Sequence, residues 1–162
     1  MGEIVKRVKD RTEEVATELN NIIFIGLYIG LNKVLGEGAK GLGAYVGREI
    51  LKLMKDKYGL NFEGSDDPQV LLDRFTRVMI NDLGFAEQGE IDVQNNDITL
   101  KLKNPMDLPV LKRLISENIA PAIYPMAYAV LAAIYDFSGK KAIVKDIIVE
   151  DDNVTVKMKI VS

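Results

Sequence analysis

The stretch Ile22–Lys57 reads IIFIGLYIGLNKVLGEGAKGLGAYVGREILKLMKDK and decides the helical part of the fold. A G-x-x-x-G spacing occurs in it twice, as Gly26/Gly30 and as Gly43/Gly47. Glycine inside a helix costs about 1 kcal/mol relative to alanine, so its repetition at this spacing needs a compensating contact. The pattern predicts that the two glycine-bearing helical segments pack closely on each other at their backbones.

Three helices are predicted in the first third of the chain. Residues 22–35 are apolar on nearly every side, which predicts a central, buried helix. Glycines 36, 38 and 41 indicate a break before a helix over 42–57. Residues 3–19 carry a narrow apolar stripe at helical intervals, typical of an amphipathic helix that lies on the outside of a domain or along a partner.

The rest of the chain alternates helices with hairpins. Asp67-Pro68 predicts a capped helix that ends at Gly84. The alternation of apolar and polar residues changes to a period of two over 90–103 and again over 142–161, which predicts two hairpins. Between the hairpins, the sequence predicts a short helix around Leu111–Ile115 and a longer one that ends at Ser138-Gly139.

These elements predict an α+β fold, in which a helical bundle packs on a four-stranded antiparallel sheet made of the two hairpins. The length of 162 residues fits a single domain over 1–162. We expect residues 1–20 to form an N-terminal amphipathic helix that can act as a dimerisation arm, and residues 22–162 to form the core.

Composition excludes several functions. The chain contains no cysteine and no histidine, which removes the commonest nucleophile, proton shuttle and transition-metal ligands. A formal net charge of −3 argues against a nucleic-acid partner. The longest apolar run, Ile22–Leu31, is too short to span a bilayer, and the first residues lack the pattern of a signal peptide. We therefore expect a cytoplasmic protein without metal, cofactor or membrane insertion.

Aromatic residues supply the candidate binding site. A tyrosine stripe, Tyr124, Tyr128 and Tyr135, lies at helical spacing and is typical either of a cavity lining or of the edge of a buried face. Arg48 follows Gly47 and could orient a ligand carboxylate or pair with a neighbouring acid. Five residues are predicted to wall an apolar pocket between the helices and the sheet, with the arginine as polar anchor: Phe24, Tyr28, Tyr45, Arg48 and Tyr128.

Two segments, Leu42–Ile50 (LGAYVGREI) after Ile29-Gly30 and Ala127–Ala133 (AYAVLAA), resemble the 4-vinyl reductase domain family. That family shares its fold with the small TRAPP vesicle-tethering subunits. The resemblance implies a TRAPP-like module, often dimeric, that binds small hydrophobic molecules as a sensor. Metal ligation and acylation through cysteine, or haem ligation through histidine, cannot be carried over, because the chain lacks both residues.

Three functions follow from these observations. The first is a non-catalytic module that binds a small hydrophobic or lipid-like ligand. The alternative is a homodimeric scaffold or tethering protein that uses its first helix. The third is a reductase-associated enzyme acting on a tetrapyrrole vinyl group; against it, no pair of Asp, Glu, Lys or Tyr stands at a productive spacing.

Overall fold

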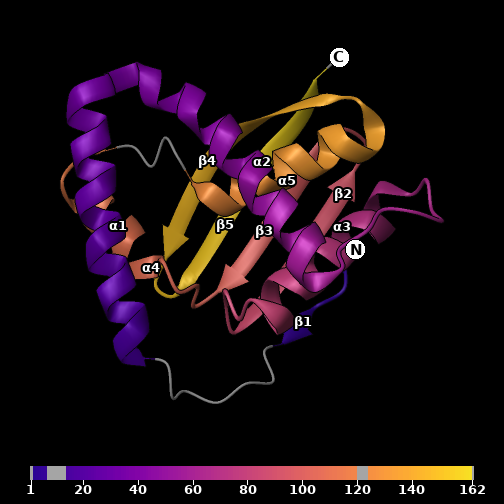
Figure 1. The fold of residues 1–162 in the computed structure, drawn as a ribbon, viewed down its shortest axis with the longest axis horizontal. Helices are drawn as coiled ribbons and strands as arrows, with labels where there is room; N and C mark the ends of the chain where they lie inside the picture. The colour runs from indigo at the N-terminus through magenta and orange to yellow at the C-terminus, as the bar shows by residue number, and fades with distance from the viewer. Residues whose placement is uncertain (1, 7–13, 120–123, 162) are drawn as a thin grey trace.

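The computed structural model describes residues 2–6, 14–119 and 124–161, except for the side chains of residues 14–18, 32, 37, 39 and 40. Helices and an antiparallel sheet make up this part of the chain, so the predicted α+β class is confirmed (Figure 1). The elements are, in order, β1 (Val5–Lys6), α1 (Glu14–Leu35), a 3-10 turn η1 (Gly36–Gly38), α2 (Ala39–Tyr58), α3 (Pro68–Arg77), a π turn η2 (Val78–Asp82), β2 (Gln88–Gln94), β3 (Asp97–Lys103), α4 (Leu108–Ser116), α5 (Pro125–Ser138), β4 (Lys141–Glu150) and β5 (Asn153–Val161).

The sheet has the order β1-β2-β3-β5-β4, and all neighbouring strands are antiparallel. Both predicted hairpins, β2-β3 and β4-β5, are confirmed. A bulge between Val144 and Asp146 shifts the register of β4 by one residue. Without this shift the second half of β4 would turn its apolar residues to the opposite face. With it, Val144 is paired with Met158 and Ile147 with Val156, all on the face that carries the helices.

The N-terminal segment departs from the prediction. Residues 3–19 were expected to form one helix, but Val5–Lys6 is a strand, with Val5 opposite Gly89 of β2. The sheet therefore has five strands rather than four. Residues 7–13 of the predicted helix lie outside the described residues.

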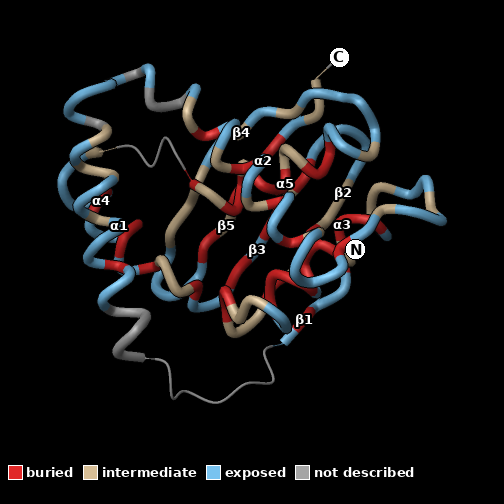
Figure 2. The backbone as a smooth tube through the Cα atoms, viewed as in Figure 1, coloured by how far each residue is buried: buried red, intermediate tan, exposed pale blue. Residues whose placement is uncertain are grey.

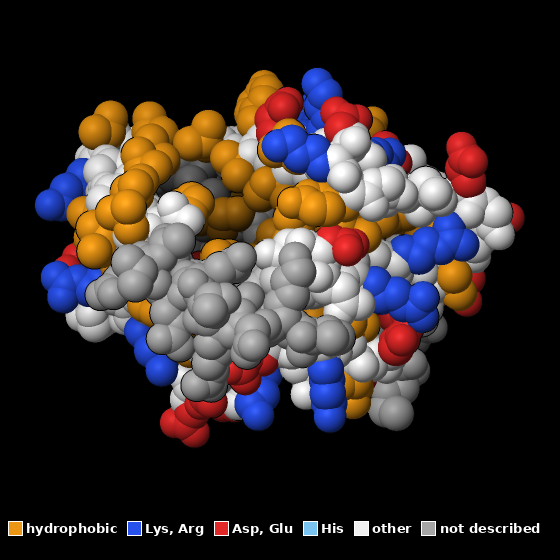
Figure 3. Space-filling view, turned by 60° about the horizontal axis from the view of Figure 1, so that its bottom comes forward, with side chains coloured by type: hydrophobic (Ala, Val, Ile, Leu, Met, Phe, Trp, Pro, Cys, Tyr) orange, Lys and Arg blue, Asp and Glu red, His pale blue; other side chains and the backbone are white. Residues whose placement is uncertain are grey.

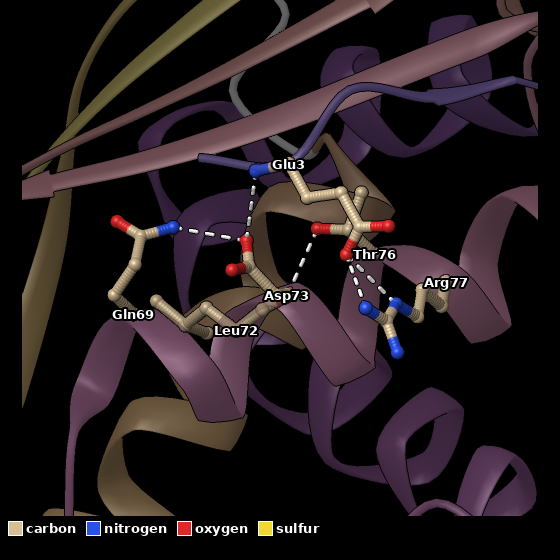
Figure 4. A network of polar contacts seen from close by, with 6 residues as sticks. All are labelled: Glu3, Gln69, Leu72, Asp73, Thr76 and Arg77. Carbon is tan, nitrogen blue, oxygen red and sulfur yellow. Dashed lines mark hydrogen bonds and ion pairs between the residues drawn. The ribbon is translucent and has the colours of Figure 1, made fainter. Parts of the chain in front are cut away.

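Polar contacts with α3 hold this segment extended. Figure 4 shows the carboxyl of Asp73 accepting the backbone N–H of Glu3, at 3.4 Å, and an N–H of Gln69, at 2.9 Å. Arg77 Nε donates to Glu3 Oε2 at 2.9 Å. Gln69 also bonds the backbone of β2 at Ile91, at 2.8 Å. These contacts fix the extended segment against α3.

The close approach predicted from glycine occurs at Gly43 and Gly47, but it joins α2 to α5 and not the two glycine-bearing segments to each other. A Cβ atom added to Gly43 would lie 2.5 Å from the ring of Tyr128, and one added to Gly47 would lie 2.3 Å from its carbonyl oxygen. The α5 helix also carries fully buried alanines, including Ala127 and Ala133. The α5 helix consequently fits between α2 and the sheet, over the middle of the core (Figure 1).

The first glycine pair is placed differently, and the prediction of a central, buried helix over 22–35 is wrong. Within the part of the chain that the structure describes, no atom outside the helix lies within 4 Å of a Cβ added at Gly26 or Gly30. The α1 helix lies at the side of the molecule, mainly against α4, and most of it is exposed (Figures 1 and 2). Ile22 is 61% exposed and Leu27 is 54% exposed. The position against the sheet is occupied by α5, whose small residues permit closer packing than the large side chains of α1.

The two glycine pairs give a matched test of this packing. We expect Gly47→Ala to lower the free energy of unfolding by about 1–3 kcal/mol, because the new methyl group collides with a backbone carbonyl. Gly30→Ala is expected to raise it by up to about 1 kcal/mol, because alanine favours the helix and meets no neighbour. Urea denaturation measures both. Equal effects would contradict the described packing.

Candidate functional site

The helices α1, α4 and α5 bring together a group of residues that we call the tyrosine–aspartate cluster, defined as Tyr28, Asp107, Tyr124 and Tyr128. Asp107 is the residue before α4 and Tyr124 the residue before α5. Both helices have a proline in the first turn, where its missing N–H costs nothing. Tyr28 extends from the inner side of α1.

One long hydrogen bond joins the two helix starts. The hydroxyl of Tyr124 donates to Asp107 Oδ1 at 3.5 Å, the outer limit for such a bond. Tyr124 is only 1% exposed, and the Asp107 residue is partly buried. The carboxyl of Asp107 is not used as a cap for the backbone N–H groups of α4. It is therefore available to a group in the cluster.

Burial controls the charges in the cluster. It raises the pKa of Asp107 from 3.8 to about 7, against the smaller, opposite effects of hydrogen bonds from its own backbone N–H and from Tyr124. Burial, and then the negative charge of Asp107, raise the pKa of Tyr28 and of Tyr124 above the usual range. The tyrosines thus stay neutral, while Asp107 changes charge near neutral pH.

Asp107 has no cationic partner among the residues that the structure describes. None of the ion pairs found there includes it, and no Lys or Arg contributes to the shift of its pKa. On α4 itself, Arg113 pairs with Glu117 at the other end of the helix. The negative form of Asp107 is consequently enclosed without compensation by a described positive charge.

The structure brings some of the predicted site residues together and separates others. The rings of Phe24 and Tyr28 lie 6.5 Å apart, and Tyr28 interacts electrostatically with Tyr128. Tyr45, however, is 66% exposed on α2, and the guanidinium of Arg48 lies over its ring at 4.9 Å. The predicted tyrosine stripe is also divided between environments, since Tyr135 is 57% exposed.

Sequence reasoning did not identify Asp107. An acidic residue before Leu108-Pro109 has the ordinary pattern of a helix cap, and nothing in the local sequence signals its burial. The predicted polar anchor was Arg48, which lies on the exposed side of α2. The polar group that the structure places among the aromatic rings has the opposite charge.

The surface on this side of the molecule is apolar and hollowed. Figure 3 shows hydrophobic side chains gathered around a hollow on the side where α1 lies. Of the exposed apolar side chains of α1, Phe24 lies next to Tyr28 of the cluster. No group of three or more potential metal-ligating side chains occurs in the described part of the chain. Apolar surface and a single buried carboxyl are thus the chemistry that this region offers.

A second concavity, of about 620 Å³, lies between the loop before α3 and the end of α5. Lys55 pairs with Asp136 there at 2.6 Å, and the ring of Phe62 meets that of Phe137 edge to face at 5.5 Å. Its remaining polar side chains lie on the loop before α3, such as Glu63, or at and after the end of α5, such as Lys140. Because its central charges already pair with each other, this groove is a weaker candidate than the tyrosine–aspartate cluster.

The fold and the cluster together define an α+β domain with an aromatic site around one enclosed acid. Comparison of sequences gives the family: residues 20–162 match the one described as "Putative rubredoxin C-terminal domain", and the chain belongs to it. An uncharacterised protein of Methanocaldococcus jannaschii is 28% identical over 140 residues, which cover 83% of each chain.

The family match corrects the resemblance drawn from the sequence. The chain matches the rubredoxin C-terminal domain family and not the 4-vinyl reductase family, so the expectations derived from the latter, including the TRAPP-like arrangement, lose their basis. The short segments 42–50 and 127–133 suggested the 4-vinyl reductase family because both are helical and rich in small residues. In the structure, the small residues of these segments allow the close contact between α2 and α5. Any closely packed pair of helices needs small residues at its contact.

Among the helices that the structure describes, none is both long and apolar enough to cross a membrane. The predicted location in the cytoplasm stays a prediction, as does the single-domain assignment.

Titration of Asp107 gives a test of the cluster. Its pKa is higher in the folded chain, at about 7, than in the unfolded chain, so the folded state binds more protons between these values. The free energy of unfolding should therefore fall as pH rises from 5 to 8, by roughly 2–3 kcal/mol. The chain has no histidine to mask this change. We expect Asp107→Asn to remove it in urea denaturation; an unchanged pH profile in the variant would contradict the described burial.

Proposed function

We propose that this domain binds a small hydrophobic molecule beside the tyrosine–aspartate cluster. The observation that carries the proposal is the grouping of tyrosine rings from separate helices around one enclosed carboxyl, on an apolar and hollowed side of the molecule. Binding sites for small molecules combine a mainly apolar lining with a few placed polar groups. The residues proposed to contact the ligand are Tyr28, Asp107 and Tyr128, with Phe24 at the rim.

The proposal is limited to binding. Asp107 has the pKa of a possible general acid or base, but the described cluster contains no nucleophile and no second group with an opposed pKa to complete an acid–base pair. The family description names a C-terminal domain of rubredoxin, and a position beside another domain is compatible with an accessory binding role. Because this chain has no cysteine, it cannot itself hold iron through thiolates.

A pair of tyrosine variants tests the site. Native mass spectrometry and solvent extraction of the purified protein identify any bound molecule, and calorimetry with naphthylmethanol measures binding of a neutral hydrophobe. We expect Tyr28→Ala to weaken binding by about tenfold or more, because it removes a ring from the cluster. The control is Tyr135→Ala, which removes the same side chain from an exposed position of α5. Equal binding by both variants would contradict the proposed place of the site.

A second candidate function, a homodimer formed through α1, is favoured by one specific observation. The outward side of α1 is unusually apolar, with Leu19, Ile22, Ile23 and Leu27 all exposed. No charged residue occurs from Leu19 to Asn32, and no neighbour from the described residues lies within 4 Å of a Cβ added at Gly26 or Gly30. A partner helix could therefore approach closely at this surface.

The charge pattern of α1 favours a second copy of the chain as that partner. In the sequence, glutamates precede the uncharged stretch and Lys33 follows it. An antiparallel pair of α1 helices, related by a two-fold axis near Gly26, would bring unlike charges together at both ends. The opposed helix dipoles favour the same orientation. In this candidate the dimer forms through the outer side of α1, instead of through residues 1–20 as the sequence predicted.

Solution mass tests this candidate. We expect a dimer by analytical ultracentrifugation, and a monomer when Ile22→Lys is combined with Leu27→Lys, because two like charges would meet across the axis. A matched control is Val70→Lys, which changes an exposed apolar residue on α3. A monomeric unsubstituted protein at high micromolar concentration would exclude this candidate without affecting the proposed ligand site.

A further inference from the structure

We propose that the molecule bound at the tyrosine–aspartate cluster is a hydrophobic amine, whose ammonium group is held by Asp107 and whose apolar part lies against the surrounding aromatic rings. This inference rests on the proposed function and gives the ligand a chemical class. Its basis is the combination of an enclosed carboxyl, aromatic rings from more than one helix, and the absence of a described cationic partner.

Charge compensation is the first argument. An ionised carboxyl that is withdrawn from water needs an opposite charge or several hydrogen bonds. Asp107 receives one side-chain hydrogen bond, from Tyr124, at the long distance of 3.5 Å. Arg113, on the same helix, is already paired with Glu117. A ligand ammonium would supply both the missing charge and up to three N–H donors.

The aromatic surroundings are the second argument. Tyr28 and Tyr128 come from α1 and α5, and the ring of Phe24 lies 6.5 Å from that of Tyr28. The face of an aromatic ring attracts a cation, and this attraction increases where water is excluded. The same rings present apolar area to a hydrocarbon chain or ring. One set of side chains can thus bind both halves of an amphipathic cation.

Other ligand classes fit less well. A carboxylate or phosphate would approach the ionised form of Asp107 against repulsion, and the described residues of the cluster offer no cation to offset it. A neutral alcohol can hydrogen-bond to Asp107 but leaves its charge without compensation. The expected order of affinity is therefore amine, then alcohol, then carboxylate.

Calorimetry with naphthylmethylamine, naphthylmethanol and naphthoate tests this order, since the three probes share one ring system. At pH 8 we expect the amine to bind at least about tenfold more tightly than the alcohol, and Asp107→Asn to remove that preference. Asp66→Asn, on the exposed loop before α3, is the matched control and should retain the preference.

A second measurement does not depend on a variant. Titration of the unsubstituted protein with the amine at pH 7, in buffers of different ionisation enthalpy, should show proton release, because the bound ammonium favours the ionised form of Asp107. Tyr28 and Tyr124 interact with this carboxyl, and their raised pKa values keep them neutral at that pH. Alcohol binding with no preference for the amine, or no proton release, would overturn the inference and leave the proposed site standing. Failure of all three probes to bind would overturn both.

Discussion

The contact between α2 and α5 is the constraint on which the rest of the structure depends. Gly43 and Gly47 allow the ring and the backbone of Tyr128 to lie directly on α2, where any side chain would collide. Because α5 fits so closely beneath α2, its opposite, alanine-rich side reaches the sheet and completes the core. The same contact fixes the position of Tyr128 itself. The packing of α5 on α2 therefore also determines the position of Tyr128 in the candidate site.

The place of α1 follows from this arrangement. With α5 on the sheet, α1 has no position in the central layer, although residues 19–32 of its sequence carry no charge, and it packs at the side on α4. Its inner side brings Tyr28 to the starts of α4 and α5, where Asp107 and Tyr124 lie. Its outer side stays exposed. One helix consequently contributes to two functional hypotheses, through opposite faces.

The sequence predicts the elements of this fold well where the signal is local. The hairpin turn at Asn95-Asn96, the cap at Asp67 and the helix end at Gly139 depend on neighbouring residues, and all three are confirmed. The errors concern tertiary placement. Hydrophobicity alone cannot decide which of two apolar helices takes the central layer, and β1 depends on partners such as Asp73 that are distant in sequence.

In the candidate site too, the sequence predicts features with a local signal and misses those that depend on tertiary placement. Tyr28 and Tyr128 were predicted because aromatic residues at helical spacing are visible in a sequence. Asp107 was not, since its unusual pKa arises from burial by segments far apart in the chain. Arg48 was selected for its charge on an apolar helix, yet that helix turns the arginine outward. Residue type and spacing thus indicate which side chains can share a face, while the enclosure that changes their chemistry is a property of the folded chain.

The two edge strands of the sheet affect how this molecule can associate with other chains. An unpaired strand edge invites another chain to extend the sheet. At one edge the short strand β1 pairs with part of β2 and so covers some of its backbone groups. At the other edge β4 carries the bulge near Val144 and three charged residues, Lys141, Lys145 and Glu150. Both edges of the sheet, as far as the structure describes them, therefore disfavour pairing with a strand of another chain, and the proposed self-association through α1 would leave the sheet unextended.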